Sequence, residues 1–294
     1  MKHLIQCGDT LELIKNVPHD SVDLLVTSPP YWAKRVYNGN GEIGSEATPE
    51  EYVSALADFF DELRPYLKKS ANVFINVGDT FFGSGAGAWN KYVDADGNVT
   101  DVQKERKEKY FTTKPLQPKI KQDGKFYQNK QLLLIPSRFA IEMQARGWLL
   151  RDDIIWHKPN RIPASVIDRF NNTYEHVFHF VLNKKYFFDL ETVKVMGANG
   201  KKKNPGDVWS INTQPLSGNH TATFPEKLIE EIVLCGSPEG GTVLEPFLGT
   251  GTTWIVCEHL KRNCIGFEIN EEFFEAAKER FISSTGVYEN ERLY

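Results

Sequence analysis

The sequence has little cysteine and no long apolar run. Only four of its 294 residues are cysteines, and no two of them have the Cys-x-x-Cys spacing of a metal site or a redox pair. We therefore expect no bound metal, and free, buried thiols in a reducing compartment, at Cys7, Cys235, Cys257 and Cys264. No segment resembles a signal peptide, and no apolar run reaches the roughly 18 residues needed to span a membrane. These absences predict a cytoplasmic protein.

The chain also lacks an overall excess of positive charge, because its formal net charge is −4. Its basic residues are concentrated instead: residues 103–130 carry nine basic and three acidic side chains, a net charge of +6, with aromatic residues between them. A local patch of this kind predicts contacts with nucleic-acid phosphates, and a solvated loop is the alternative. The candidate phosphate-binding cations are Lys104, Arg106, Lys107, Lys109, Lys201, Lys202 and Lys203.

Short apolar runs alternate with amphipathic segments along the chain. The apolar runs predict buried parallel strands at 22–27, 72–77, 153–157, 176–182, 242–246 and 264–268. Helical periodicity predicts helices at 49–67, 137–146, 225–235, 252–262 and 271–283. This alternation predicts an α/β fold with a doubly wound sheet, whose active site lies at the carboxyl ends of the strands.

Two long segments interrupt this alternation. Residues 83–130 open with a glycine-rich run and lack apolar periodicity, and residues 189–219 are similarly irregular and polar. Loops of this length in a compact domain are usually functional or disordered. We therefore predict one catalytic domain over 1–294, with a basic loop insertion at 83–130 and a candidate target-recognition segment at 189–219.

The tetrapeptide Ser28-Pro29-Pro30-Tyr31 closes the apolar run 22–27. Two successive prolines offer no N–H group to a sheet, so the chain must leave the strand here. They do offer carbonyl oxygens, while the serine adds a hydroxyl and the tyrosine a flat aromatic face. Acceptors beside a stacking ring are suited to hold a planar base by its exocyclic amino group. A strand-terminating turn that buries a tyrosine is the alternative.

A second motif lies more than two hundred residues downstream, where the strand at 242–246 runs into Gly249-Thr250-Gly251 and then into a helix. The glycines allow close approach of a ligand, and the helix N-terminus offers N–H groups to it. The third glycine of a dinucleotide fingerprint and the Gly-Lys-Ser/Thr of a triphosphate loop are both absent. Glu268 ends the next strand at about the distance expected for a carboxylate that binds a ribose, with a helix-start acid as the alternative.

Together, these two motifs resemble those of the β-class DNA amino-methyltransferases, which transfer a methyl group from S-adenosylmethionine to an exocyclic amine of cytosine or adenine. In that class the catalytic tetrapeptide precedes the cofactor loop, as it does here, and the resemblance covers nearly the whole chain. It implies a Rossmann-like methyltransferase sheet with a circularly permuted motif order. The residues that it implies for cofactor binding are Asp9, Thr223, Phe224, Glu245, Pro246, Phe247, Gly249, Thr250, Gly251, Thr252, Glu268 and Asn270.

Shorter blocks extend the resemblance. The segment around Asp9 is similar to the family's N-terminal cofactor segment, in which the aspartate contacts the adenine of the cofactor. Residues 76–79, Asn-Val-Gly-Asp, are similar to a middle block, and residues 220–225 to a segment that helps hold the methionine end. Glu245 stands where family members usually carry aspartate before Pro-Phe, which keeps the carboxylate but lengthens its reach.

The resemblance assigns catalysis to Ser28, Pro29, Pro30 and Tyr31. An exocyclic amine shares its lone pair with the ring, and acceptors placed on its hydrogens favour the reactive geometry. The serine hydroxyl and the first proline carbonyl supply such acceptors, and the tyrosine stacks on the flipped base. Trp32 extends this platform and contacts DNA, or simply packs. Methylation at carbon 5 of cytosine is excluded, because that reaction uses a Pro-Cys nucleophile and the chain has no Pro-Cys.

The target and the partners also follow from the resemblance. Serine before Pro-Pro-Tyr goes mostly with cytosine, so we expect methylation of the N4 amine of a flipped cytosine in double-stranded DNA, with adenine N6 as the alternative. A cognate restriction endonuclease is a further expected partner. An RNA or protein-glutamine methyltransferase and a catalytically silent DNA-binding specificity protein are the alternatives from other classes. Protein-glutamine enzymes, however, carry asparagine before Pro-Pro-Tyr and place the cofactor loop first.

Overall fold

The computed structural model describes residues 1–32, 43–82, 91–93, 99–101, 120–122, 125–128, 130–161, 166–214 and 224–287. The chain forms two compact units, each assembled from separate segments of the sequence. The first unit consists of Met1–Pro29, Asp58–Val77 and Met143–Tyr294, and the second of Pro30–Ala57 and Gly78–Glu142. The tetrapeptide at 28–31 therefore contributes two residues to each unit. That the chain acts as one catalytic domain stays a prediction.

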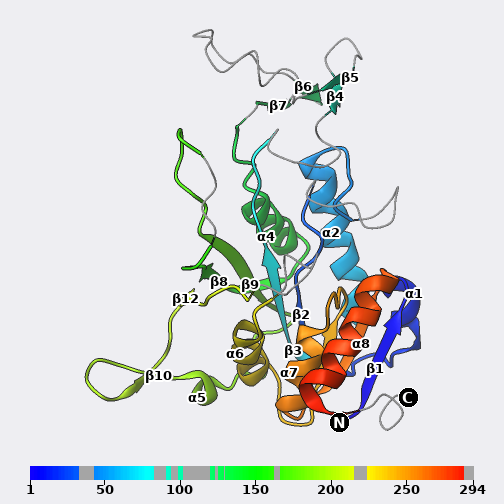
Figure 1. The fold of residues 1–294 in the computed structure, drawn as a ribbon, viewed down its shortest axis with the longest axis vertical. Helices are drawn as coiled ribbons and strands as arrows, with labels where there is room; N and C mark the ends of the chain where they lie inside the picture. Colours follow the sequence, from blue (N-terminus) through cyan, green and yellow to red (C-terminus); the bar gives the residue numbers. More distant parts are fainter. Residues whose placement is uncertain are drawn as a thin grey trace. The chain divides into compact units, whose positions relative to one another are not determined.

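The first unit is built around a sheet in which the described residues form eight strands (Figure 1). The strands β1, β14, β13, β2 and β3 are successive parallel neighbours, so the first strand of the chain pairs with the last. The predicted α/β class is confirmed. In spatial order the strands are β1 (His3–Cys7), β14 (Asn263–Glu268), β13 (Thr242–Glu245), β2 (Val22–Thr27), β3 (Leu67–Val77), β9 (Tyr174–Val181), β8 (Leu149–His157) and β12 (Val208–Ser210).

Strand β9 is the exception to the predicted parallel order. It lies between β3 and β8 and runs antiparallel to both, with Asn76 opposite Val177 and Ile155 opposite His176. In the described chain no helix separates β8 from β9, and a direct connection joins antiparallel strands, whereas a parallel pair needs a crossover. The prediction of a parallel strand at 176–182 is therefore right in position and wrong in direction.

Three helices form one layer against this sheet. They are α6 (Glu226–Gly236), α7 (Thr252–His259) and α8 (Glu271–Thr285), and α7 contacts both of the others. α6 packs on β2 and β3, α7 on β14, and α8 on β1 and β14. Between α7 and α8, the rings of Trp254 and Phe281 stack with their centroids 3.8 Å apart, and both contact the ring of His3 in β1. The core thus lies between these helices and the sheet.

The second unit contains the first part of α2 (Pro49–Leu63). This helix begins with a capping box, in which Thr48 Oγ1 accepts from the Glu51 N–H at 3.2 Å and Glu51 Oε2 accepts from the Thr48 N–H at 3.0 Å. The predicted helix 49–67 ends early, because Pro65 follows in a 3-10 turn (Arg64–Tyr66) and lacks the N–H needed to continue the helix.

The described parts of the segment 78–142 contain α4 (Ile135–Ala145), which extends into the first unit, and two antiparallel hairpins. The hairpins lie within the predicted insertion 83–130, so the described residues of that insertion have local order. They are formed by β4 (Lys91–Val93) with β5 (Val99–Asp101) and by β6 (Ile120–Gln122) with β7 (Lys125–Tyr127).

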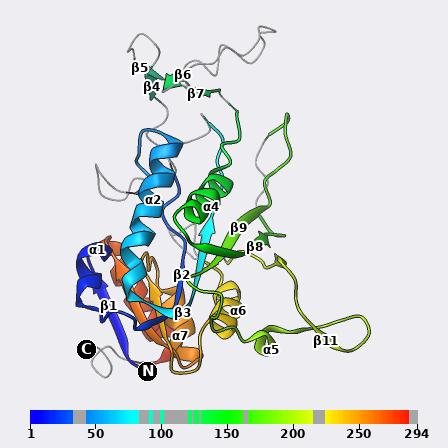
Figure 2. The same ribbon diagram turned by 180° about the vertical axis from the view of Figure 1, so that it is seen from behind.

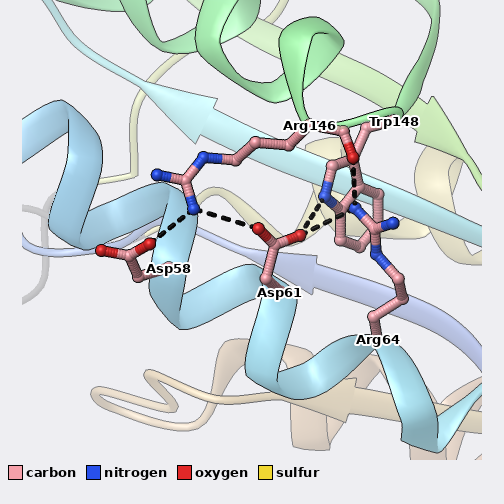
Figure 3. A network of polar contacts seen from close by, with 5 residues as sticks. All are labelled: Asp58, Asp61, Arg64, Arg146 and Trp148. Carbon is pink, nitrogen blue, oxygen red and sulfur yellow. Dashed lines mark hydrogen bonds and ion pairs between the residues drawn. The ribbon is translucent and has the colours of Figure 1, made fainter.

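A polar network in the first unit joins the end of α2 to the turn before β8 (Figure 3). Asp61 accepts hydrogen bonds from Arg64 at 2.7 Å, from Arg146 at 3.0 Å and from the indole N–H of Trp148 at 2.9 Å. Arg146 also reaches Asp58 at 2.5 Å, and the guanidinium of Arg64 lies 4.5 Å from the centre of the Trp148 ring. Because one carboxylate serves three donors, the network fixes the point at which β8 begins.

The segment 189–219 is more regular than its composition suggests. Its described part, which ends at residue 214, contains α5 (Leu190–Val193), a hairpin of β10 (Val195–Met196) and β11 (Lys202–Lys203), and then β12. β12 adds to the sheet beside β8, in parallel. The expected irregularity holds for the loops between these elements but not for the elements themselves, because strands of two or three residues are too short to leave a periodic pattern. Within the described chain, no helix has the length and apolar character that crossing a membrane requires.

Candidate active site

Four segments of the first unit end at the same edge of the sheet. β1, β14, β13 and β2 are parallel neighbours, so their carboxyl ends point to one side. Asp9 follows the first of these ends, Glu268 closes the second, the turn 246–251 follows the third, and Ser28 follows the fourth. The structure thus brings predicted cofactor residues from both ends of the chain to the edge where the tetrapeptide begins. In open α/β sheets this is the edge at which ligands bind.

The turn at 246–251 is shaped by hydrogen bonds from its own backbone. The N–H of Leu248 donates to the Phe267 carbonyl at 2.9 Å, and the N–H of Gly249 donates to Glu268 Oε2 at 2.7 Å. Gly249 and Gly251 have φ values of +56° and +79°, which favour glycine. A Cβ on Gly251 would lie 3.0 Å from the Cβ of Ala277 in α8. The second glycine is therefore required by packing against α8, and not only by ligand approach as the sequence suggested.

Glu268 joins this turn to the start of α8. Its carboxylate accepts from the N–H groups of Gly249 and Asn270, the latter at 2.9 Å, and the side chain is only 7% exposed. Burial raises the pKa of this carboxyl, while the backbone hydrogen bonds act in the opposite direction. Asn270 in turn caps α8 by accepting from the Phe273 N–H at 3.0 Å. The carboxylate is thus held rigidly at the strand end, where a ribose contact was predicted.

The N-terminal segment is tied to the same turn. Asp9 caps α1 (Thr10–Leu13) by accepting from the N–H groups of Leu11 at 2.8 Å and Glu12 at 3.2 Å. The buried hydroxyl of Thr10 donates to the Pro246 carbonyl at 2.6 Å. The sequence analysis did not single out this threonine, although it lies within the Gly-Asp-Thr block. The contact fixes the position of the predicted adenine-binding segment beside the turn.

Glu245 lies inside the fold, beneath the turn. Its side chain is 2% exposed, and its carboxylate accepts from the hydroxyls of Thr27 and Thr253, the second at 3.0 Å, and from the Phe247 N–H at 3.3 Å. Burial raises the pKa of this carboxyl to about 8. These partners belong to the end of β2, the start of α7 and the turn itself. Glu245 therefore connects the strand that carries Ser28 to the predicted cofactor turn, whereas its direct cofactor contact stays a prediction.

Ser28 extends the edge toward β3 and β9. Its Oγ lies 3.5 Å from Oδ1 of Asn76, at the limit of a hydrogen bond. The Asn76 side chain is buried, and its Nδ2 donates to the His176 carbonyl of β9 at 3.0 Å. Asn76 was recognised only as part of a similar block, and its contact with Ser28 depends on the pairing of β2 with β3.

The remaining half of the tetrapeptide lies in the second unit. The Pro30 carbonyl accepts from the hydroxyl of Tyr52 at 2.9 Å. Tyr31 lies against Gly78, where an added Cβ would fall 2.5 Å from Cε2 of the tyrosine ring. Only glycine at position 78 permits this approach, and sequence reasoning assigned no role to Gly78. The glycine of the Asn-Val-Gly-Asp block was the available signal.

Comparisons with known proteins agree with this arrangement. The model of the family described as DNA methylase, which covers the N6 and N4 enzymes, matches residues 22–279. The chain belongs to this DNA methylase family. The family assignment confirms the predicted DNA methyltransferase and its cofactor, S-adenosylmethionine.

Similar proteins cover most of the methylase. The Type II methyltransferase M.SmaI of Serratia marcescens is 40% identical over 279 residues, which are 94% of this chain and 89% of that protein. M.Cfr9I of Citrobacter freundii is 34% identical over 93% of this chain and 85% of that protein. Among solved structures, the PvuII DNA methyltransferase (cytosine-N4-specific) matches with a TM-score of 0.68 and 21% identity over 99% of this chain and 89% of that one. This last likeness confirms the methyltransferase fold.

Trp32 occupies the packing position that was one of its two predicted alternatives. The side chain of this residue in the methylase is 3% exposed, and its indole N–H donates to the Glu46 carbonyl at 3.0 Å. The buried ring offers little surface to a duplex in this structure.

Of the other predicted site residues of the methylase, some are packed in the core, some are exposed, and some lie outside the described residues. Phe224 packs against the core, and the rings of Phe247 and Phe59 lie 4.8 Å apart. Thr250 and Thr252 are buried and accept hydrogen bonds from Arg280. The cations at 201–203 are exposed on the β10–β11 hairpin, which Figures 1 and 2 place beside α5, away from the connection between β8 and β9. Thr223, Lys104, Arg106, Lys107 and Lys109 lie outside the described residues.

One prediction about the thiols is wrong. All four cysteines are free, and three are buried, but Cys7 is exposed. It is the last residue of β1, at the outer edge of the sheet, opposite Glu268 in the register. Partial burial, together with the neighbouring acids Glu271 and Glu268, raises the pKa of its thiol. In the described part of the methylase no cluster of three or more His, Cys, Asp or Glu side chains is placed to hold a metal ion.

Proposed function

We propose that this methylase transfers a methyl group from S-adenosylmethionine to the N4 amine of a cytosine in double-stranded DNA. The observation that carries the proposal is the hydroxyl of Ser28, which stands at the end of β2, on the same edge as the turn 246–251 and Glu268. A neutral hydroxyl at this position, in place of a carboxylate, is what the resemblance associates with cytosine. The likeness in fold to the cytosine-N4-specific PvuII enzyme supports the same target.

The strand-end residues fit the cofactor by their chemistry. Glu268 offers carboxylate oxygens to ribose hydroxyls, and Asp9 offers a carboxylate for the adenine amino group. Gly249 and Gly251, both with positive φ, leave two positions of the turn without side chains, and Gly251, the N-cap of α7, has no side chain that would block the helix N-terminus. When bound, the cofactor supplies an electrophilic methyl group on a sulfonium.

The chain's own residues prepare the amine for attack. The Ser28 hydroxyl and the Pro29 carbonyl accept hydrogen bonds from the amino group, which favours localisation of its lone pair and offsets the positive charge that develops on nitrogen. Asn76, at 3.5 Å, orients the hydroxyl. Tyr31, backed by Gly78, offers a stacking face to the base. When the methyl group passes to nitrogen, the sulfonium would leave as neutral S-adenosylhomocysteine, and the cationic nitrogen would release one proton to water. No covalent bond to the enzyme is needed.

Methylation of the N6 amine of adenine is the second candidate, since the family includes both kinds of enzyme. Purified enzyme is incubated with duplex DNA and deuterated S-adenosylmethionine, and the nucleosides are separated by mass. Labelled N4-methylcytosine is the expected product. Labelled N6-methyladenine, with no cytosine product, would overturn the cytosine proposal and leave the family assignment intact.

The relatives' designation as Type II methyltransferases supports a role in restriction and modification. We propose that a cognate endonuclease cuts the same sequence and that both proteins act in the cytoplasm, where the DNA is. Sequencing methylated bases after expression in an unmodified host gives the recognition sequence. DNA from that host should then resist an endonuclease that cuts this sequence, and full cleavage would contradict the pairing.

The basic clusters are proposed to bind DNA phosphates. Neutralising Lys104, Arg106, Lys107 and Lys109 together should weaken duplex binding without changing cofactor affinity. Each lost phosphate contact should reduce the slope of log K against log salt by about 0.9. Neutralising Lys201, Lys202 and Lys203 is the matched experiment on the other cluster. An unchanged slope in either variant would show that its cluster is only a solvated surface.

A further inference from the structure

Two large apolar side chains are almost fully exposed in the connection between β8 and β9. Phe170 is 97% exposed and Ile167 is 92% exposed, the highest exposures among the large hydrophobic residues of the described chain. Neither sequence motif accounts for them. An isolated exposed apolar residue is common, but two of them only three positions apart in one connection indicate a contact surface.

We propose that Phe170 and Ile167 form an apolar wedge that enters the DNA base stack and keeps the duplex open beside the flipped target base. The proposal rests on the proposed function, because it supplies the step that brings a paired base to Ser28. Proteins that unstack and kink DNA insert Phe, Leu, Ile, Met or Pro between base steps. The occupant of this surface is therefore a base step of double-stranded DNA.

The connection projects from the edge that carries Ser28. Thr27 pairs with Ile75, Asn76 with Val177, and Val177 with Ile154, so one level of the sheet runs from the end of β2 across β3 and β9 to β8. β8 continues for three residues past this level before the connection begins. Figures 1 and 2 show the connection extending beyond the sheet from β8 and β9. The wedge thus belongs to the same unit as the cofactor turn and lies beyond the same strand ends.

The base of the connection is firmly held. The N–H of Lys158 donates to the Thr173 carbonyl at 2.7 Å, which closes its two limbs. The buried ammonium of Lys158 pairs with Glu175 at 2.5 Å and lies 3.9 Å from the centre of the Trp156 ring. A wedge must be mounted rigidly, because a flexible tip would yield instead of parting the bases.

A second pair of hydrogen bonds joins the start of the β8–β9 connection to the segment that follows β12. Asn160 Nδ2 donates to the Thr213 carbonyl at 2.9 Å, and its Oδ1 accepts from the Thr213 N–H at 2.8 Å. The β8–β9 connection and the predicted recognition segment 189–219 are thereby tied together. If the segment 189–219 recognises a DNA sequence, its contact with Asn160 would position the wedge on the β8–β9 connection.

The charge around the wedge fits a polyanion. The described parts of the connection, 158–161 and 166–173, carry Arg161 and Arg169 besides Lys158, against one acid, Asp168. Arg161 is exposed, and Arg169 donates to the carbonyl of Phe170 at 3.0 Å, which ties the guanidinium to the backbone beside the wedge. Arg169 stands between the two apolar residues in the sequence, so a cation is available for a phosphate beside the base step that they enter. An apolar protein partner would not require this charge.

The test compares Phe170→Ala and Ile167→Ala with the wild-type enzyme on two duplexes of the sequence that the wild type methylates. In the first duplex the target base is paired, and in the second it faces an abasic site, so that little work is needed to extrude it. We expect each variant to methylate the paired duplex roughly tenfold or more slowly, and to methylate the second duplex within about twofold of wild type. Phe170→Leu, which keeps an apolar tip, should restore most of the activity on the paired duplex.

Two further measurements distinguish a loss of base flipping from a loss of cofactor binding. With 2-aminopurine in place of the target base, the fluorescence increase on binding should fall in Phe170→Ala, while S-adenosylmethionine affinity stays unchanged. Ile141→Ala is the matched control, because this residue of α4 is 66% exposed and has no assigned role. Unchanged activity on the paired duplex, or an equal loss on both duplexes, would overturn the wedge. The methylated nucleoside made by wild type tests the proposed function independently of either variant.

Discussion

The turn that follows β13 and the turn that follows β2 leave neighbouring parallel strands at the same edge, yet they are built differently. The first has its shape fixed by its own N–H groups, which bond to Phe267, Glu268 and Leu248, and by two glycines with positive φ. The second contains Pro29 and Pro30, which have no N–H groups, and its serine is held to Asn76 by a contact of 3.5 Å.

This difference matches two tasks. A cofactor turn must hold one shape, so its donors are used within the fold and glycine meets its conformational demands. A catalytic turn must present acceptors to an incoming amine, and consecutive prolines leave carbonyl oxygens without adding donors. Glu245 joins the two, since it accepts hydrogen bonds from Thr27 on one side and from Thr253 and Phe247 on the other.

The largest effect is expected from Gly251→Val, which breaks the cofactor turn. The new side chain meets Ala277 at 3.0 Å from a residue with φ of +79°, so both strain and overpacking act. We expect a loss of about 2–4 kcal/mol in the free energy of unfolding and no measurable cofactor binding. Denaturant titration and calorimetry measure the two effects. Gly240→Val is the control, with φ of +75° but no atom near its Cβ, and it should leave cofactor binding intact.

Ser28→Ala breaks the catalytic turn and should slow methyl transfer roughly tenfold to a thousandfold, because one preorganised polar contact is lost. Tyr31→Ala should cause comparable damage by removing the stacking face. Cofactor affinity should remain that of wild type, in contrast to Gly251→Val. Single-turnover transfer and calorimetry measure the two quantities, and Ser21→Ala, at the other end of β2, serves as the control. Full transfer rates in both variants would show that the tetrapeptide is not the catalytic site.

Glu268→Ala should weaken S-adenosylmethionine binding by about 1–3 kcal/mol through the lost ribose contact and the lost support of Gly249. Glu268→Gln keeps one acceptor oxygen and should lose less. Calorimetry on folded variants provides the measurement. If the alanine variant binds the cofactor as tightly as wild type, Glu268 has a structural role only, as the acceptor of the hydrogen bond from the Asn270 N–H.

The smallest effect at neutral pH is expected from Glu245→Gln, which replaces the residue that joins the two turns. Its effect is on how the free energy of unfolding depends on pH. The folded pKa, about 8, is raised above the ordinary value of 4.5, so the folded state holds a proton that the unfolded state has lost between these values. The stabilisation is therefore complete below about pH 4.5 and is lost as the pH rises through 8. Wild type should lose stability over this range by at most about 1.4 kcal/mol per pH unit relative to Glu245→Gln. The free energy of unfolding of both proteins is measured by denaturant titration from pH 5 to 9. A constant difference between wild type and Glu245→Gln over this range would contradict the prediction.

Local patterns predicted the parts of the molecule that depend on local sequence. β2 was expected at 22–27 and spans Val22–Thr27, because a buried strand is a continuous apolar run. The turn 246–251 was recognisable from the spacing of its glycines. The direction of β9, the support of Tyr31 by Gly78, and the burial of Glu245 against Thr27 were not predictable, because each depends on contacts between residues far apart in sequence. The exposure of Phe170 likewise required the position of the β8–β9 connection.

The pairing of β13 with β2 also has a consequence for protein synthesis. Leu24 and its partner Val243 are separated by about 220 residues, so the ribosome completes β2 long before its neighbour exists. At 5–20 residues per second, this interval lasts roughly 10–40 s. During that time one edge of the central strand has no partner, and the sequence Val-Asp-Leu-Leu-Val-Thr is open to pairing with other chains. The turn 246–251 and the strand end at Glu268 form only after β13 and β14 are synthesised, so we expect a chain that ends before β13 to be unable to methylate DNA.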